Sequence, residues 1–208
     1  MKEKEEARLI ELKKIDKEFF EKGVKYIAGI DEAGRGPLAG PVVVACVVLP
    51  ENSMIEGVND SKKISEAKRE KLYDIIIQEA ISYGVGIIYQ DEIDEINILQ
   101  ATKKGVTEAI KQMEVKPNII MVDALNGIDT MGIPYKSIIK GDAKCYSIAA
   151  ASIIAKVTRD RIMREWDKVY PEYGFASHKG YGTAKHIAAI KEVGPCPIHR
   201  KTFITKFI

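Results

Sequence analysis

The hydrophobic residues of the chain follow two different periods. Over residues 3–23, Leu9, Leu12, Ile15 and Phe19 recur at steps of three and four between charged side chains, which predicts an amphipathic helix. Gly23 can end that helix as a C-cap. An apolar stripe of this kind is typical of a terminal helix packed on the body of a protein, more than of a helix reserved for a partner.

Beyond residue 25, short runs rich in Val, Ile and Tyr and bounded by Gly or Pro predict strands at residues 26–31, 41–49, 83–89, 118–122 and 135–139. Helical patterns occupy residues 66–81, 98–113 and 147–169, and one more helix ends near Gly194. Strands that alternate with helices indicate an α/β fold. The first strands follow one another so closely that we expect antiparallel neighbours, and therefore a mixed sheet.

The predicted elements divide the chain into an N-terminal helical extension, residues 1–23, and an α/β domain, residues 24–208, whose final portion is helical. A chain of 208 residues, 46% of them hydrophobic, is long enough to bury one sizeable core. No feature requires more than a monomer. No run approaches the roughly 18 apolar residues of a membrane span, and the charged N-terminus is unlike a secretion signal.

Charge and cysteine content narrow the function classes only a little. The formal net charge is +2, from 32 basic and 30 acidic residues, so a nucleic-acid partner must be argued from local residues. Cys46, Cys145 and Cys196 are scattered and form no C-x-x-C pair, which argues against a disulfide framework or a zinc ribbon. We therefore expect a reducing, cytoplasmic location.

Four acidic residues lie at or just beyond the ends of predicted strands: Asp31, Glu32, Asp123 and Asp142. An apolar strand that carries a carboxylate to its end loses stability unless the charge is compensated, and a hard divalent cation is a common compensation. A single such Asp is more often a turn or cap residue, and Asp142 can equally precede a helix as its cap. Together, however, the four acids predict a metal site.

The ligand type limits which metal that site would hold. No His or Cys stands at ligand spacing from these acids, and all-oxygen ligation selects Mg²⁺ or Mn²⁺ over Zn²⁺. Two such ions held by carboxylates suit the in-line attack of water on a phosphodiester. Because neighbouring strand residues point to opposite faces, Asp31 and Glu32 are expected to share an ion only where the chain leaves regular strand geometry.

The segment GRGPLA, residues 34–39, matches the dinucleotide fingerprint G-x-G-x-x-A by letter alone. That fingerprint must open a helix, whereas Pro37 and the β-branched run that follows predict another strand. Gly34 and Gly36 around Arg35 instead allow backbone amides to approach a sugar-phosphate ligand closely, with a guanidinium at hand for a phosphate. An ordinary glycine-containing connection is the alternative.

Several longer strings occur in the order of a known family. They are GIDEAGRGPLAG at residues 29–40, NDSKK at 59–63, KGD at 140–142, AAASIIAKVTRD at 149–160 and YGFASHKGY at 173–181. From residue 26 to residue 203 the chain resembles bacterial ribonuclease HII, the type 2 ribonuclease H. The resemblance implies a ribonuclease H-like mixed sheet flanked by helices, with a helical C-terminal portion, and leaves only the N-terminal helix outside.

The resemblance also implies an activity and its residues. Such an enzyme hydrolyses the RNA strand of an RNA/DNA hybrid, incises 5′ of a single ribonucleotide in duplex DNA, and leaves 5′-phosphate and 3′-hydroxyl ends. Its acidic tetrad falls on the four acids named above. Its loop for the ribose 2′-hydroxyl falls on residues 34–36, a group that separates RNA from DNA. Tyr181 matches a tyrosine that stacks on the next deoxyribose; without the family, a loop aromatic that caps the core is an equal interpretation.

Basic residues could complete a nucleic-acid surface. Besides Ser61, in the loop at residues 60–63, the candidates for phosphate contact are Lys62, Lys63, Lys140, Lys144 and Lys179, each of which can equally be a solvated lysine. Asp160 lies inside a helix and is more typical of a salt bridge than of catalysis. Cys196 and His199 lack a partner pair for zinc.

Two other function classes remain as alternatives. A nucleic-acid-binding module could use the same loop and lysines, but has little reason to place carboxylates beside a phosphate unless a metal intervenes. A metal-dependent phosphotransferase would need a phosphate-cradling loop, and the chain has no G-x-x-x-x-G-K-[ST] string. We therefore expect a nuclease, with a replication or repair protein as a further partner.

Overall fold

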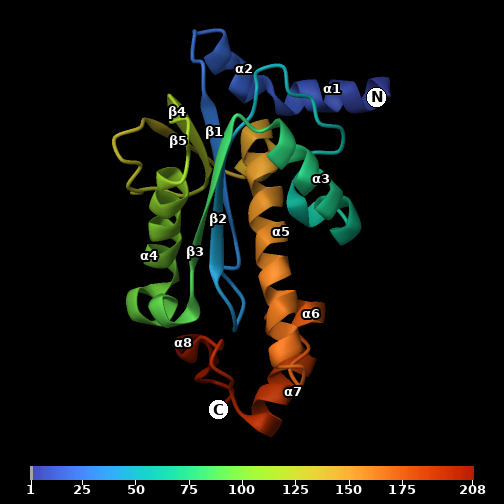
Figure 1. The fold of residues 1–208 in the computed structure, drawn as a ribbon, viewed down its shortest axis with the longest axis vertical. Coiled ribbons are helices and arrows are strands. Elements are labelled where there is room, and N and C mark those ends of the chain that lie inside the picture. Colours follow the sequence, from blue (N-terminus) through green and yellow to red (C-terminus); the bar gives the residue numbers. More distant parts are fainter. Residues whose placement is uncertain (1) are drawn as a thin grey trace.

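A five-stranded mixed sheet forms the centre of the computed structural model, which describes residues 2–208 (Figure 1). Its strands are β1 (Ile27–Ala33), β2 (Val42–Val48), β3 (Ser82–Ile88), β4 (Ile119–Asp123) and β5 (Tyr135–Ile138), in the spatial order β3-β2-β1-β4-β5. β1 pairs antiparallel with β2, and β2 with β3, whereas β4 runs parallel to β1 and to β5. The mixed α/β sheet predicted from the sequence is confirmed.

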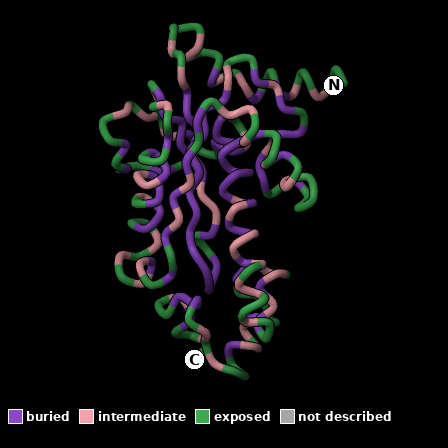
Figure 2. Tube along the Cα trace, viewed as in Figure 1, coloured by how far each residue is buried: buried purple, intermediate pink, exposed green. Residues whose placement is uncertain are grey.

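Helices cover both faces of this sheet (Figure 1). Helix α4 (Gln90–Lys111) packs on β2 and β3, and α5 (Tyr146–Val169) packs on β1 and β2 from the other side, next to α3 (Glu66–Glu79). Alternate residues of β2 serve the two layers: Val44 and Cys46 join the α4 core, and Ala45 and Val47 join the α5 core. Figure 2 shows that the strands are buried along most of their length.

Two predicted helices differ in extent from those observed. Helix α4 begins eight residues before the predicted start at residue 98, but Asn97 interrupts it with φ 66° and ψ 163°. The Asn97 side chain accepts hydrogen bonds from the amides of Leu99 and Gln100, and so caps the part that the sequence pattern predicted. The predicted helix over residues 3–23 is in fact two, α1 (Glu3–Leu12) and α2 (Lys14–Phe20).

The two N-terminal helices are packed on the body. Leu9 and Leu12 are buried in the core beneath α3 and α5. Asp16 is also buried, and its carboxylate accepts hydrogen bonds from the amide of Ser147 at 3.0 Å and from the Ser147 hydroxyl at 2.8 Å. Since Cys145, the N-cap residue of α5, makes no side-chain cap bond, Asp16 caps α5 from a different part of the chain.

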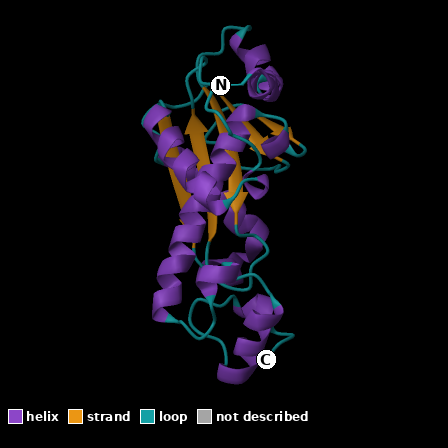
Figure 3. Cartoon of the chain, turned by 90° about the vertical axis from the view of Figure 1, so that its right-hand side faces the viewer, coloured by secondary structure: helices purple, strands orange, loops and turns teal. Residues whose placement is uncertain are grey.

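The C-terminal portion lies at the opposite end of the sheet from α1 and α2 (Figure 3). It contains three short helices, α6 (Phe175–His178), α7 (Ala184–Val193) and α8 (Lys201–Ile204). They pack around a core of their own that includes Leu38, Ala39 and Met163. Two single-turn 3₁₀ helices, η1 (Ser61–Lys63) and η2 (Gly141–Ala143), lie in the loops that carry candidate site residues. Within residues 2–208, no helix has the length and apolar character to cross a bilayer.

Candidate active site

Asp31 and Glu32 lie inside β1 and not in a loop after it. The antiparallel pairing with β2 continues through Ala33, opposite Val43, so β1 keeps regular strand geometry between the two acids and the condition stated for their sharing one ion is not met. The parallel pairing of β1 with β4 ends earlier, at Ile30. β1 therefore extends past the pairing with β4, and both acids lie beside the end of that strand.

The other two acids come from the end of β4 and from the turn that follows β5. Asp123 is the last residue of β4, and its Oδ1 accepts a hydrogen bond from the amide of Gly141 at 2.7 Å. Asp142 is buried in η2 and does not cap α5, so that alternative is excluded. An added Cβ on Gly141 would lie 2.6 Å from the Cδ1 methyl group of Ile148, so a larger residue at this position would require that side chain to shift.

The acids repel one another across this site. Burial, followed by the charge of Glu32, raises the pKa of Asp31 well above its usual value, and Asp123 and Asp142 add to the effect. Burial also raises the pKa of Glu32 and of Asp123, although Arg35 and the Gly141 amide respectively act in the opposite direction. The structure thus brings the four predicted acids together as one cluster with excess negative charge.

Two basic side chains compensate part of that charge. Lys62 Nζ lies 3.2 Å from Asp142 Oδ2, and a guanidinium nitrogen of Arg35 lies 3.3 Å from Glu32 Oε1. The Lys62 side chain is 75% exposed and that of Arg35 45% exposed, so each can exchange its carboxylate for a phosphate at small cost.

A cavity of about 190 Å³ unites most of the predicted site. It is lined by Asp31, Glu32, Ala33, Gly34, Arg35, Gly36, Ser61, Lys62, Lys156 and Tyr181. Asp123 and Asp142 do not line it, although Asp142 is linked to it through its contact with Lys62. Residues from β1, the glycine loop, η1, α5 and the α6–α7 connection therefore converge on one space.

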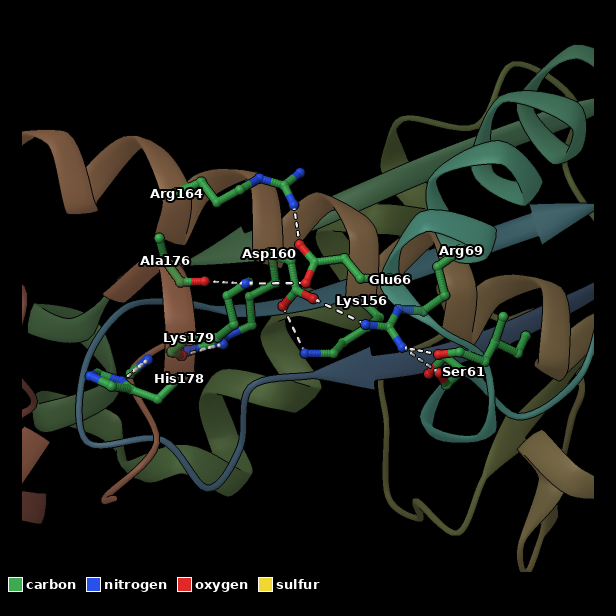
Figure 4. Close-up of polar contacts among 12 residues, drawn as sticks. Ser61, Glu66, Arg69, Lys156, Asp160, Arg164, Ala176, His178 and Lys179 are labelled. Atoms are coloured by element: carbon green, nitrogen blue, oxygen red, sulfur yellow. Dashed lines mark hydrogen bonds and ion pairs between the residues drawn. The ribbon is translucent and has the colours of Figure 1, made fainter. Parts of the chain in front are cut away.

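Lys156 is a cavity residue that sequence reasoning missed. Its ammonium donates to Asp160 at 2.7 Å, one turn further along α5, and Asp160 also lies 3.6 Å from the guanidinium of Arg69 (Figure 4). Arg69 in turn donates to the carbonyl of Ser61 at 2.9 Å. Asp160 is buried in salt bridges as predicted, and it holds a lysine toward the cavity. The four-residue spacing of Lys156 and Asp160 within one string was the available signal.

The remaining predicted lysines differ in their surroundings. Lys179 is buried and donates to Glu66 and to the carbonyl of Ala176, so the expectation that it is a phosphate contact or a solvated lysine is wrong (Figure 4). Lys63 lies 4.0 Å from Asp60 at the protein surface. Lys144 faces a separate cavity of about 530 Å³ beside α1 and α2.

The three histidines, which are not at zinc spacing in the sequence, gather behind Tyr181. His186 Nδ1 donates to the carbonyl of Tyr181 at 2.9 Å, and its Nε2 lies 3.0 Å from Nε2 of His199. The amide of Cys196 donates to Nδ1 of His199 at 2.9 Å. Burial lowers the pKa of His186 to about 4 and also lowers that of His199, so both rings are neutral at pH 7 and His199 donates to His186.

Comparison with known proteins places this chain in a family. Residues 28–206 match the family model described as Ribonuclease HII. The chain belongs to the ribonuclease HII family. It is 59% identical over 206 residues to ribonuclease HII of Acetivibrio thermocellus, covering 99% of this chain and 80% of the relative. It is 56% identical to ribonuclease HII of Caldanaerobacter subterraneus subsp. tengcongensis, over 99% of this chain and 85% of that relative.

Solved structures of the family agree with the fold. Ribonuclease H2 from Pyrococcus horikoshii superposes with a TM-score of 0.73 at 32% identity, over 88% of this chain and 96% of that chain. RNase HII from Archaeoglobus fulgidus, solved in a complex with PCNA, also superposes with a TM-score of 0.73. Its sequence identity is 30%, over 85% of this chain and 94% of that chain. The predicted ribonuclease H-like fold is therefore confirmed. The similarity to bacterial relatives also includes the N-terminal helices, which the strings had left outside.

As a ribonuclease HII, this protein is a metal-dependent endonuclease that cleaves the RNA strand of RNA/DNA hybrids. Its four acids offer only oxygen ligands, and burial and mutual repulsion raise the pKa values of Asp31 and Glu32, two features whose chemistry suits a divalent cation. Within residues 2–208, however, no group of three or more Asp, Glu, His or Cys side chains is arranged so that it could hold a metal ion. In proteins Mg²⁺ usually keeps several waters and is often bound through one or two carboxylates together with substrate phosphates.

Proposed function

We propose that this ribonuclease HII also incises duplex DNA on the 5′ side of a single embedded ribonucleotide, leaving 5′-phosphate and 3′-hydroxyl ends. One observation carries the proposal: the cavity joins two acids of the cluster to the glycine loop and to Tyr181. A nuclease that recognised only the backbone would have no need for a sugar-reading loop at the acids. This arrangement suits a substrate in which one ribose is the sole difference from DNA.

We assign the chemistry to the carboxylate cluster. Asp31, Glu32, Asp123 and Asp142 would hold two Mg²⁺ or Mn²⁺ ions, which when bound activate water and neutralise the leaving oxyanion. Lys62 and Lys156 point into the same cavity as two of the acids and would bind the backbone phosphates next to the cut. Ser61 would place its polar atoms along the same strand.

We assign sugar recognition to the other end of the cavity. Arg35 and Gly36 are both exposed residues, and an added Cβ on Gly36 would have only the ring of Tyr181, at 3.8 Å, within 4 Å. A ribose at Gly36 would thus have its 2′-hydroxyl at the loop amides, and the next deoxyribose would stack on Tyr181. The Tyr181 side chain is 44% exposed, which leaves its ring open to a ligand.

We further propose that the protein acts as a monomer and that a replication protein brings it to DNA. The archaeal relative crystallised with PCNA supports a partner of that kind. Lys63 and Lys144 lie outside the cavity and would contact phosphates further from the cut.

The test is incision of an end-labelled duplex that carries one ribonucleotide, with an all-DNA duplex beside it, in Mg²⁺, in Mn²⁺ and in chelator. We expect metal-dependent incision 5′ of the ribonucleotide only. Asp123→Asn should lower the rate by about 10³-fold or more, because a neutral amide keeps the shape but loses several kcal/mol of charge stabilisation. Asp91→Asn, on the exposed first turn of α4, is the matched control and should cut like the parent.

Two outcomes would contradict the proposal. Tight binding without incision under either metal would indicate a binding module. ATP binding with transfer of its phosphate would indicate the phosphotransferase alternative.

A further inference from the structure

Two arginines are buried directly behind the glycine loop. Arg159, on α5, is 1% exposed, and Arg200, before α8, is 0% exposed. Within residues 2–208, neither has a carboxylate within ion-pair distance. Burial lowers the pKa of Arg159 to about 10 and that of Arg200 to about 9, so both remain charged at neutral pH. A buried charge without a counter-ion persists only when hydrogen bonds satisfy it.

Main-chain carbonyls supply all of those hydrogen bonds. Arg200 donates to the carbonyls of Gly34 at 2.6 Å, Arg35 at 3.0 Å and Gly40 at 2.9 Å. Arg159 donates to the carbonyls of Pro41 at 2.9 Å, Ala39 at 3.0 Å and Lys179 at 2.8 Å. The whole connection from β1 to β2, together with the chain just before Tyr181, is thus held by two guanidinium groups.

The direction of these bonds sets the direction of the loop amides. In a trans peptide the C=O bond and the N–H bond of the next residue lie in one plane and point in opposite directions. Because Arg200 holds the carbonyls of Gly34 and Arg35 inward, the N–H groups of Arg35 and Gly36 point outward. No backbone or side-chain acceptor in the described chain receives either N–H. The outward face of the loop therefore presents two free donors.

Gly34 is the point where loop and arginines interlock. Its φ is +98°, a conformation that favours glycine, and an added Cβ would lie 2.1 Å from Nε of Arg159. The loop is thus seated on the guanidinium groups at van der Waals distance. A small displacement of either arginine must move the loop with it.

We propose that Arg200 is a positioning residue for sugar discrimination: by holding the Gly34 and Arg35 carbonyls, it aims the amides of Arg35 and Gly36 at the ribose 2′-hydroxyl. This role rests on the proposed function and deepens it. Arg200 itself touches no substrate. Its planar fork bonds two adjacent carbonyls at once, which the single ammonium of a lysine cannot reproduce at the same distances.

The test measures discrimination and not overall activity. In an Asp123→Asn background, which prevents cutting, affinity is measured for a duplex with one ribonucleotide and for the same duplex in DNA only. The ratio of the two affinities does not depend on the fraction of protein that is folded. We expect Arg200→Lys to lower that ratio by about tenfold, the loss of one well-placed hydrogen bond, with little change in affinity for plain DNA.

Arg161→Lys is the matched control. Arg161 lies on the same helix as Arg159 but pairs with Glu70 at 2.6 Å on the surface, away from the loop, so its ratio should equal that of the parent. A second variant covers the case in which Arg200→Lys does not fold. Phe203 stacks on the Arg200 guanidinium at 5.1 Å, and Phe203→Leu should lower the ratio in the same direction but less.

The outcomes distinguish the role of Arg200 from sugar recognition by the glycine loop, on which that role rests. A parent that prefers the ribonucleotide duplex, with a folded Arg200→Lys that keeps the full ratio, overturns the role of Arg200 alone. The same holds if Phe203→Leu is the only folded variant and keeps the full ratio. A parent that binds both duplexes equally overturns sugar recognition by the loop, and this role for Arg200 with it.

Discussion

The carboxylate cluster and the arginine pair, Arg159 with Arg200, each bury like charges at one end of the glycine loop, but they are stabilised differently. The arginines repel each other, since Arg159 lowers the pKa of Arg200, yet every bond they make is to a carbonyl of the protein itself. The acids can only accept hydrogen bonds, and carbonyls offer them nothing. Their raised pKa values show that the protein leaves their charge incompletely compensated.

The arginine pair is therefore a region whose charges are satisfied by the protein itself, whereas the carboxylate cluster is a region whose charges are not. The arginine pair is complete in the free protein and can therefore fix the loop before substrate arrives. Under the proposed function, cations and phosphate would supply the compensation that the carboxylate cluster lacks, so binding and catalysis could draw on the resulting free energy. Three experiments test this distinction, beginning with the largest expected effect.

Removing a charge from the arginine pair should strongly destabilise the folded protein. Arg159→Met leaves three buried carbonyls without donors, and we expect a loss of about 3–5 kcal/mol in the free energy of unfolding by urea denaturation. Arg161→Met, which removes a surface guanidinium, should change that value by less than about 0.5 kcal/mol. Equal stability of Arg159→Met and the parent would show that the carbonyls do not need the charge.

Adding a cation to the carboxylate cluster should stabilise the folded protein. At a Mg²⁺ concentration 100 times its dissociation constant, the free energy of unfolding should rise by about 2.7 kcal/mol. Asp31→Asn should remove most of this gain, and should also make the metal-free protein more stable than the parent, because an amide avoids both burial of charge and repulsion. If the metal-free variant were less stable, the cluster would be a structural feature complete without cations.

A fall in pH should change the stability contributions of the carboxylate cluster and of His186, behind Tyr181, in opposite directions. The pKa values of Asp31, Glu32 and Asp123 are raised in the folded protein, so its cluster gains stability as pH falls toward them. His186 behaves in the opposite way: its pKa falls from 6.5 to about 4 on folding, so the unfolded chain binds more protons in between and stability is lost as pH falls through this window.

Urea denaturation at pH 7 and at pH 4.5 can separate these two contributions. The histidine contribution should be about 2 kcal/mol. His186→Asn keeps a donor for the Tyr181 carbonyl but does not titrate, so it should lose less stability than the parent over this range. An Asp31→Asn variant should lose more. Identical pH dependence in all three proteins would contradict the assignment.

The positions of the four acids were easier to predict from the sequence than the role of the arginine pair. Asp31, Glu32 and Asp123 could be found because each follows or ends a short apolar run, a local pattern with a known chemical meaning. The strands and α5 were predicted for the same reason. Asp142 was found as a candidate, but its surroundings could not be, because they depend on how η2 packs against α5.

The arginine pair was missed for a physical reason. A buried arginine has the same letter as a solvated one, and its partners here are carbonyls, which every residue carries and no letter marks. Arg200 reaches Gly34 across 166 residues of chain, so no local pattern connects them. Lys179 was wrongly grouped with solvent-facing lysines because its buried position depends on the fold of the C-terminal portion.

The cap that Asp16 places on α5 also orders events in time. Asp16 and Ser147 are 131 residues apart in the chain. At the usual pace of translation the ribosome adds that much chain in on the order of 10 s, so a newly made α2 exists long before the helix that it caps. The turn that carries Asp142 directly precedes α5, so it cannot take its final place against a capped helix until the residues of α5 have been added to the chain.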